Sequence, residues 1–396
     1  MAKREGVSRA GPGLAGLPVA ALFVAALLVG TGPVRSAERG RPAAPAPAPA
    51  PAPSLDPDVT LLLVGDGGEP RAGGEPVLAA LAREAAAAPA RSVVVFLGDN
   101  VYPKGIPPEG DPGYTEALRR LGDQVRAATA GGARAIFVPG NHDWELGGPG
   151  GLAAVGREEV LVASLGAGRA RLLPTAGGPG PAVVDLGTTV RLVALDTQWW
   201  LHPAERGEGS AAGASAALGE ALAGAAGRRT VVVSHHPLRS GGPHGTLPGL
   251  LDHLFPLRHV ATWAWLPLPG IGSAYPVWRA SWGSPQDMPS PAYRALRADL
   301  LSAFRRARPL VHAAGHDHSL QLLRGDAAAG EAEWEVVSGT GWAGGENPVR
   351  RLPETLFARS VPGFVRVDAF AGGRVEVRVL VVSKAKCREA FLLRLG

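Results

Sequence analysis

Five short stretches of this sequence carry side chains that bind metal ions, each beside a glycine or at the end of a β-branched run. Together they supply two Asp, one Tyr, one Asn and three His as candidate ligands. The stretches are Gly65-Asp66-Gly67-Gly68, Gly98-Asp99-Asn100-Val101-Tyr102, Gly140-Asn141-His142-Asp143, Val232-Val233-Ser234-His235 and Gly315-His316-Asp317-His318. These donors are sufficient to hold two metal ions around one shared carboxylate, and such a pair of ions can hydrolyse phosphate esters.

The anionic donors suit one kind of ion and the neutral donors another. Carboxylate and phenolate oxygens, as in Asp66 and Tyr102, are hard ligands that favour a trivalent ion. Amide oxygen and imidazole, as in Asn141 and His235, favour a divalent ion of intermediate hardness. Asp99 lies three residues before Tyr102, so that it can bridge the two ions.

His316 and His318 complete the set of candidate ligands. They are two residues apart on a predicted loop after the apolar run 310–314, so that their imidazoles can approach from one side and bind one ion each. In phosphate ester hydrolysis, two ions ~3.5–4 Å apart activate water and stabilise the charge on the phosphoryl oxygens.

The segments between these stretches predict a sheet covered by helices. Apolar runs at 59–64, 93–97, 135–138 and 231–233 each end abruptly in a polar loop, and helix-like stretches occupy 77–88 and 114–130. This alternation is typical of βαβ units. Because the loops at the carboxyl ends of such strands converge, they can bring all the candidate ligands together.

The C-terminal third is richer in strands. Residues 334–337, 363–368 and 374–382 are rich in Val and Phe, and Ala371-Gly372-Gly373 predicts a hairpin turn between the last two runs. We expect a second sheet packed on the first within one domain.

The five stretches resemble the motifs of the purple acid phosphatases, a branch of the calcineurin-like metallophosphoesterases. They look most like the small tartrate-resistant enzymes of animals. The family pattern D-x-G, G-D-x-x-Y, G-N-H-[DE], V-x-x-H and G-H-x-H occurs here in the same order, and the resemblance extends from Val59 to the C-terminus. Five ordered motifs are a specific signal. The resemblance implies an α/β fold, a four-layer α/β/β/α sandwich with a dinuclear metal site at the carboxyl ends of the strands.

The resemblance also implies which residue binds which ion. Fe(III) is expected on Asp66, Tyr102 and His318, a divalent ion (Fe, Zn or Mn) on Asn141, His235 and His316, and Asp99 between them. Tyr102 favours the purple branch, because most other calcineurin-like enzymes lack a tyrosine ligand and carry His where this chain has Gly68.

Two further histidines are implied to be catalytic. His142 matches the family residue that contacts phosphate or orients the nucleophile, and His244 matches one that protonates the leaving group. His236 is either an additional substrate contact or a surface residue.

Three aspartates near the motifs are expected to have supporting or bystander roles. We expect Asp143 to support a neighbouring His through a hydrogen bond. Asp317 is expected to be exposed, and Asp196 is a weaker candidate for a supporting residue.

Composition argues against nucleic-acid binding. The formal net charge is +5, but Lys3, Arg4, Arg9 and Arg35 against Glu5 place +3 of it in residues 1–37 and leave 5 − 3 = +2 for the remainder. No basic run with interleaved aromatic residues occurs in that remainder. The single cysteine, Cys387, excludes an intrachain disulfide.

The N-terminal segment predicts export. The chain starts with basic residues, and the apolar run 17–29 follows. Because this run is shorter than the ~20 residues of a spanning helix, it favours a signal peptide over a signal anchor within residues 1–37. Residues 38–57 contain an Ala/Pro tract, typical of a stiff linker or an inert leader. Residues 58–396 are then the metallophosphoesterase domain of a periplasmic, secreted or N-terminally anchored protein.

A Trp/Pro-rich insertion at about 247–291 leaves three interpretations open. It contains Trp263, Trp265, Trp278 and Trp282, and its prolines exclude a spanning helix. It is a lid that selects substrates, an interfacial membrane patch, or a packed cover of the sheet.

The sequence therefore predicts an exported phosphoesterase whose metal-bound hydroxide attacks phosphate monoesters. Two alternatives keep the same scaffold: a phosphodiesterase or lipid-linked pyrophosphatase, and a non-catalytic surface protein that binds metal. The expected partner is a phosphoester substrate, with peripheral membrane contact through the insertion left open.

Overall fold

The computed structural model describes residues 56–202, 207, 209–245, 254, 255, 257, 265–268, 273, 284–384 and 386–396. The predicted signal and almost all of the linker lie outside the described residues, as does most of the Trp-rich insertion. Within the described ranges, no helix is both long and apolar enough to cross a membrane.

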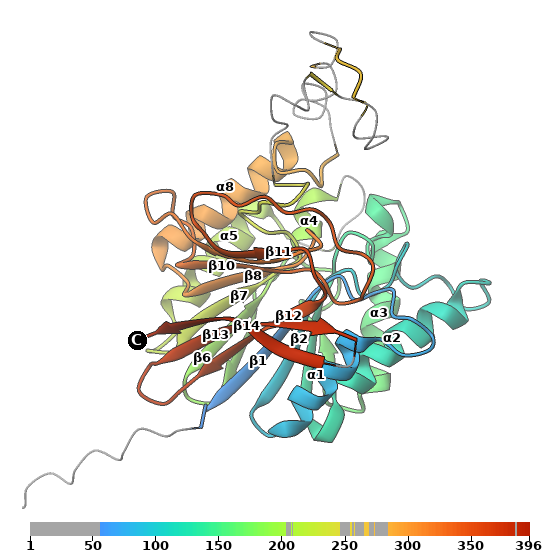
Figure 1. Cartoon of the computed structure of the whole chain (residues 1–396), viewed down its shortest axis with the longest axis horizontal. Coiled ribbons are helices and arrows are strands. Elements are labelled where there is room, and N and C mark those ends of the chain that lie inside the picture. Colours follow the sequence, from blue (N-terminus) through green and yellow to red (C-terminus); the bar gives the residue numbers. More distant parts are fainter. Residues whose placement is uncertain are drawn as a thin grey trace, which may run out of the picture. The chain divides into compact units, whose positions relative to one another are not determined.

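Two seven-stranded sheets stack face to face in this part of the chain (Figure 1). The first has the order β14-β13-β12-β1-β2-β3-β4 and the second the order β11-β9-β10-β8-β7-β6-β5. The strands of the first sheet are β1 (Val59–Val64), β2 (Ser92–Leu97), β3 (Arg134–Val138), β4 (Ala170–Leu172), β12 (Gly363–Ala369), β13 (Val375–Ser383) and β14 (Lys386–Leu395). Those of the second are β5 (Ala182–Leu186), β6 (Val190–Ala194), β7 (Arg229–Val233), β8 (Val311–Ala314), β9 (Leu320–Arg324), β10 (Trp334–Ser338) and β11 (Thr355–Arg359).

Helices cover the outer face of each sheet. The helices on the first sheet are α1 (Pro76–Ala87), α2 (Tyr114–Ala128) and α3 (Gly151–Gly166), and those on the second are α4 (Thr197–Leu201), α5 (Ala211–Ala223) and α8 (Pro291–Arg306). Two short 3₁₀ turns occupy Ala130–Gly132 and Glu145–Gly147. The result is the predicted four-layer α/β/β/α arrangement.

Strand β1 shows why the inner strands are uniformly apolar. Leu61 and Leu63 pack into the core between the two sheets, whereas Leu62 and Val64 pack against the helices. Successive side chains of a strand point to opposite faces, so a strand covered on both sides must be apolar at every position. Each such side chain contributes roughly 1.5–3 kcal/mol by its burial.

The predicted strands and helices are confirmed to within about two residues, but one expectation about the sheets was wrong. Strands β12 and β13 do not belong to the second sheet, because β12 pairs antiparallel with β1 and thereby extends the first sheet. The second sheet is built from β5 to β11 instead. The apolar residues of a strand show that the strand is buried, but they do not determine which other strand it pairs with.

Asp196 follows β6 and begins helix α4. Its buried carboxylate accepts hydrogen bonds from the Trp199 amide at 3.1 Å and from the Trp144 indole at 2.9 Å. Burial raises the pKa of Asp196 to about 7, although these hydrogen bonds act to lower it.

We expect Asp196 to make the stability of the fold depend on pH. The pKa of Asp196 is about 7 in the folded protein and ~3.9 in an unfolded chain. Between these values the folded state binds more protons, so the free energy of unfolding falls as the pH rises, by about 4 kcal/mol at most. Urea denaturation at both ends of this window, beside the non-titrating Asp196→Asn variant, measures the difference. An identical pH dependence in both proteins would contradict the assignment.

Candidate metal centre

The candidate ligands lie in loops at the carboxyl ends of five strands. Strands β1, β2 and β3 of the first sheet and β7 and β8 of the second each place one of them two or three residues beyond the strand end: Asp66, Asp99, Asn141, His235 and His316. Both sheets therefore contribute to one cluster. Tyr102 and His318 join it from the same loops as Asp99 and His316.

One group of donors surrounds the Tyr102 phenol oxygen. This oxygen lies 3.1 Å from Asp99 Oδ2, 3.4 Å from Asp66 Oδ1 and 3.1 Å from His318 Nε2. His318 Nε2 is also 3.3 Å from Asp66 Oδ1.

A second group surrounds the Asn141 amide oxygen. Asn141 Oδ1 lies 2.9 Å from His235 Nε2 and 3.2 Å from His316 Nδ1, and these two ring nitrogens are 3.2 Å apart. Asp99 reaches both groups, because its Oδ1 lies 3.5 Å from His235 Nε2 while its Oδ2 faces Tyr102.

Main-chain carbonyl groups fix the direction in which the three imidazoles point. His235 Nδ1 lies 2.8 Å from the Leu97 carbonyl and His318 Nδ1 lies 2.7 Å from the Gly345 carbonyl. His316 Nε2 lies 3.0 Å from the Gln286 carbonyl. A carbonyl only accepts, so each of these nitrogens carries the hydrogen and the other nitrogen presents its lone pair to the cluster.

This donor set fits metal ions. The lone pairs of Asn141 Oδ1, His235 Nε2 and His316 Nδ1 meet with no hydrogen to share among them, which is unfavourable unless a cation lies between. Ligand atoms bound to one ion at ~2.1 Å and at right angles lie ~3 Å apart, which matches the observed separations. One ligand atom from each of Asp66, Asp99 and His235 also lies within 4.8 Å of the other two.

The protonation states of the donors also suit the binding of metal ions. Burial, followed by the charges of the neighbouring histidines, lowers the pKa of His316 well below its ordinary value, so that its imidazole is neutral. Burial acts to raise the pKa of Asp99, but His235 and His142 outweigh it and lower that pKa.

The backbone at the cluster is strained, and one glycine is sterically required. Asp66, Asp99 and His316 have φ values of 56°, 54° and 68°, in the left-handed region that non-glycine residues avoid. A Cβ atom on Gly68 would lie 2.6 Å from the Asp99 carbonyl oxygen. The chain can therefore carry no side chain at position 68, and the Tyr102 amide donates to the Gly68 carbonyl there at 3.2 Å.

The two histidines predicted to be catalytic flank the cluster. His142 donates its amide hydrogen to Asp99 Oδ1 at 2.9 Å, and its Nε2 lies 3.8 Å from Asp99 Oδ2. The His244 ring lies 4.2 Å from the His316 ring, centroid to centroid, and its Nδ1 is 2.9 Å from Asp287 Oδ1. The structure thus brings all nine predicted site residues together.

The sequence model of calcineurin-like phosphoesterases matches residues 59–265, which is just over half of the chain. The chain belongs to the calcineurin-like phosphoesterase family. Members of this family hydrolyse phosphoester bonds with a dinuclear metal centre. No curated protein sequence matches the chain significantly.

One solved structure shares the fold of this phosphoesterase. Purple acid phosphatase PPD1 from yellow lupin (Lupinus luteus) seeds aligns with a TM-score of 0.51 and 14% identity over 84% of this chain and 53% of that one. This chain thus spans about half the length of the lupin enzyme, and the likeness at this identity shows the fold alone. GAP50, the anchor in the inner membrane complex of Plasmodium, aligns with a TM-score of 0.49 and 14% identity over 85% of this chain and 88% of that one.

Asp143 supports the centre of the phosphoesterase in a different way from that expected. It bonds to none of the histidines that the structure describes, and its buried carboxylate instead accepts from the amides of Asn100 and Val101 at 3.0 Å and of Gly140 at 2.8 Å. The Asn100 side chain also donates to Glu158 of α3 at 2.9 Å. Asp143 therefore ties together the two loops that carry Asp99 and Asn141.

The expectation that Asp317 is exposed was wrong, and one of the two alternatives for His236 is excluded. Asp317 is buried and accepts from the Ser240 hydroxyl and, at 3.1 Å, from the His244 amide. His236 is not a surface residue, because its ring is buried between Thr197 Oγ1 at 2.8 Å and Gln286 Oε1 at 2.6 Å. Both residues position the loops around His316.

A buried network of polar groups behind His235 was not predicted from the sequence. His312 Nδ1 lies 2.9 Å from Glu335 Oε1, and its Nε2 lies 2.9 Å from Ser234 Oγ. The same Glu335 oxygen accepts from the Leu238 amide at 2.7 Å. Through Ser234 and Leu238, this network holds both ends of the loop that carries His235. Gln286 and Asp287 were also missed, since they lie in the insertion outside any motif.

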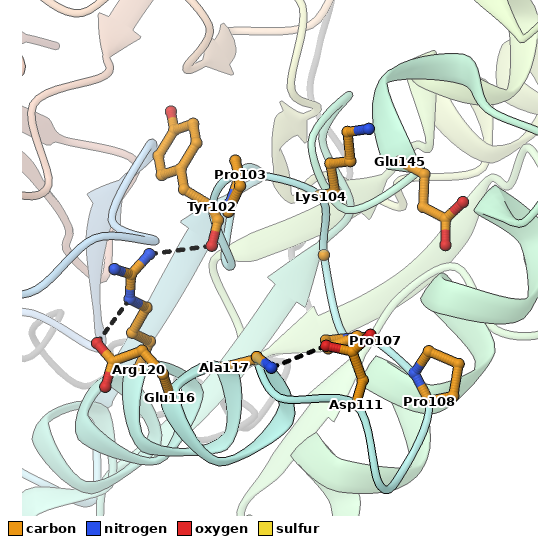
Figure 2. A pocket seen from close by; sticks show the side chains of 12 residues that line it. Tyr102, Pro103, Lys104, Pro107, Pro108, Asp111, Glu116, Ala117, Arg120 and Glu145 are labelled. Atoms are coloured by element: carbon orange, nitrogen blue, oxygen red, sulfur yellow. Dashed lines mark hydrogen bonds and ion pairs between the residues drawn. The ribbon is translucent and has the colours of Figure 1, made fainter.

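A cavity of ≈470 Å³ opens beside Tyr102, between helix α2 and the loop that follows Tyr102 (Figure 2). Arg120 crosses its wall to donate to the Tyr102 carbonyl at 3.0 Å and to Glu116 at 3.0 Å. Its charged lining residues are Lys104, Asp111, Glu116, Arg120 and Glu145. Because both signs of charge are present, this cavity has no general preference for anions.

Proposed function

We propose that this chain is an exported phosphatase of the purple acid phosphatase type, which hydrolyses phosphate monoesters at a dinuclear centre of one trivalent and one divalent ion. The observation that carries the proposal is the position of the Tyr102 phenol between Asp99, Asp66 and His318, at 3.1–3.4 Å. A phenol placed among two carboxylates and an imidazole is well suited to bind a hard trivalent ion.

The proposed ligand sets follow the two groups of donors. Fe(III) would be held by Asp66, Tyr102 and His318, a divalent Fe, Zn or Mn ion by Asn141, His235 and His316, and Asp99 would be shared. Such a pair of ions would supply a nucleophile from water at moderate pH and neutralise charge on the phosphoryl oxygens.

The protein's own residues then position the ester and move protons. His142 is held by two hydrogen bonds: its amide donates to Asp99, and its Nδ1 lies 2.7 Å from the Pro103 carbonyl. Its Nε2 is therefore directed toward the space beside Asp99, where it binds the phosphoryl group. His244, oriented by Asp287, delivers a proton to the leaving oxygen.

We also propose the organisation predicted from the sequence. Residues 58–396 form the metallophosphoesterase domain, residues 1–37 direct export, and residues 38–57 are a linker. The match of the family model from residue 59 and the first strand, which also begins at Val59, support the start of the domain.

Comparison of a monoester with a diester tests the proposal. The purified full-length protein, supplied with iron and zinc, is expected to hydrolyse p-nitrophenyl phosphate with a kcat/KM at least ~10-fold above that for bis(p-nitrophenyl) phosphate. The His244→Ala variant is expected to lose more rate on an alkyl phosphate than on p-nitrophenyl phosphate, because only the alkoxide leaving group needs the proton.

A preference for the diester would replace this proposal with a phosphodiesterase. Full metal content with no turnover of either ester would instead indicate a metal-binding protein without catalytic function.

A further inference from the structure

A second cavity lies at the end of the strands opposite to the metal centre. It has a volume of ≈240 Å³ and lies where the edge strands β4 and β5 of the two sheets face each other. A single water molecule needs only ~10–15 Å³ of such space. Its charged lining residues are Arg134, Arg169 and Arg171, and its apolar lining includes Ile136, Val184 and Leu186.

The strand register places the three arginines on one face of the first sheet. In the pairing of β3 with β4, Ile136 stands opposite Arg171, and Arg134 and Arg169 precede these residues by two positions. Residues two apart on a strand point to the same face. That face is directed toward the second sheet, because Ile136 belongs to the core between the sheets.

The three guanidinium groups have no acidic partner. In the described part of the chain, none of them forms an ion pair or a side-chain hydrogen bond, and no Asp or Glu lines the cavity. The nearest acid on β5, Asp185, lies on the opposite face of its strand from Val184 and Leu186 and is paired with Arg191 at 2.7 Å.

All three arginines are exposed to solvent at the rim of the cavity, above a floor of buried apolar groups such as Ile136 and Leu186. Like charges side by side on neighbouring strands repel each other. A multiply charged oxyanion reverses the sign of the interaction. Guanidinium groups bind phosphate oxygens in pairs through their planar donors.

We propose that this arginine cavity binds a phosphate or diphosphate group at a second site, separate from the metal centre. Arg134 begins β3 and Asn141 follows its end, so about seven residues, on the order of 20 Å of extended chain, separate the two sites. The inference rests on this cavity alone and does not require the proposed phosphatase activity.

Calorimetric titration with methylenediphosphonate, which is not hydrolysed, tests the site. The full-length protein carrying Asp99→Asn serves as the background, so that binding at the metal centre is weakened. Replacing Arg134, Arg169 and Arg171 together with glutamine in this background is expected to weaken diphosphonate binding at least ~10-fold. The same three substitutions in the otherwise native protein are expected to leave p-nitrophenyl phosphate hydrolysis unchanged, which also shows that the variant folds.

The matched control removes the same charge elsewhere. Arg126, Arg388 and Arg394 are exposed arginines that do not line this cavity, and their replacement with glutamine is expected to leave diphosphonate affinity unchanged. Equal affinity in the cavity variant, or an equal loss in the control, would overturn the proposal. So would arginine-dependent binding to vesicles with anionic lipid in the absence of any diphosphonate binding, since that result would indicate a membrane surface instead.

Discussion

Replacing Asp99 with alanine is expected to empty the metal centre and to lower kcat/KM for p-nitrophenyl phosphate by at least ~10³-fold. Asp99 is buried and is the carboxylate that reaches both donor groups, through His235 on one side and Tyr102 on the other. Without its charge, two cations would face each other with nothing between them to offset their repulsion. Metal analysis of the purified protein and initial rates measure the two effects.

A second substitution separates this effect from misfolding. Asp99 has a left-handed φ of 54°, which asparagine tolerates better than alanine does. Asp99→Asn therefore keeps the shape and the backbone of the site, and it is expected to show the same loss. Asp326→Asn, at an exposed turn, should retain metal and activity. Two metal ions per chain and an unchanged rate in Asp99→Asn would refute the bridging role.

Substitution of Tyr102 by phenylalanine is expected to abolish the visible colour of the iron-loaded protein. Burial, followed by the negative charges of Asp99 and Asp66, raises the pKa of Tyr102 well above its ordinary value, so without metal the phenol stays protonated. An adjacent trivalent ion reverses this balance and makes the phenolate the stable form. Its charge transfer to Fe(III) then gives an absorption band in the visible range, which phenylalanine cannot produce.

The spectrum distinguishes ligand from neighbour. Tyr114→Phe, at the start of helix α2, changes a tyrosine outside the donor groups and should keep the band. Native protein loaded only with zinc should be colourless. An iron-loaded native protein without the band would rule out Tyr102 as a ligand and would favour a zinc or manganese centre.

The ligand set could be predicted from the sequence because each ligand lies close to the end of a strand. Tyr102 lies three residues after Asp99, and His318 lies two residues after His316. Residues so close in the sequence stay close in space in any fold. The loops converge because strands β1, β2 and β3 are parallel neighbours, which the βαβ pattern predicted.

The residues that support the ligands could not be predicted in the same way. Asp317 follows a ligand in the sequence, which suggested an exposed loop, but its partners Ser240 and His244 are more than seventy residues away. The joining of β12 to β1 likewise unites segments about three hundred residues apart. Such contacts depend on which surfaces remain uncovered after the local elements have formed, and no pattern within one segment contains that information.

The carbonyl groups that orient His235, His316 and His318 belong to the main chain at Leu97, Gln286 and Gly345. A point mutation cannot delete a main-chain carbonyl, so the hydrogen bonds that orient the imidazoles do not depend on the side chains of these three residues. The side chains have separate constraints, because Leu97 is buried in the core and Gln286 Oε1 lies 2.6 Å from the His236 ring. A search for functional residues by invariance alone would overlook the part of the site that its backbone supplies.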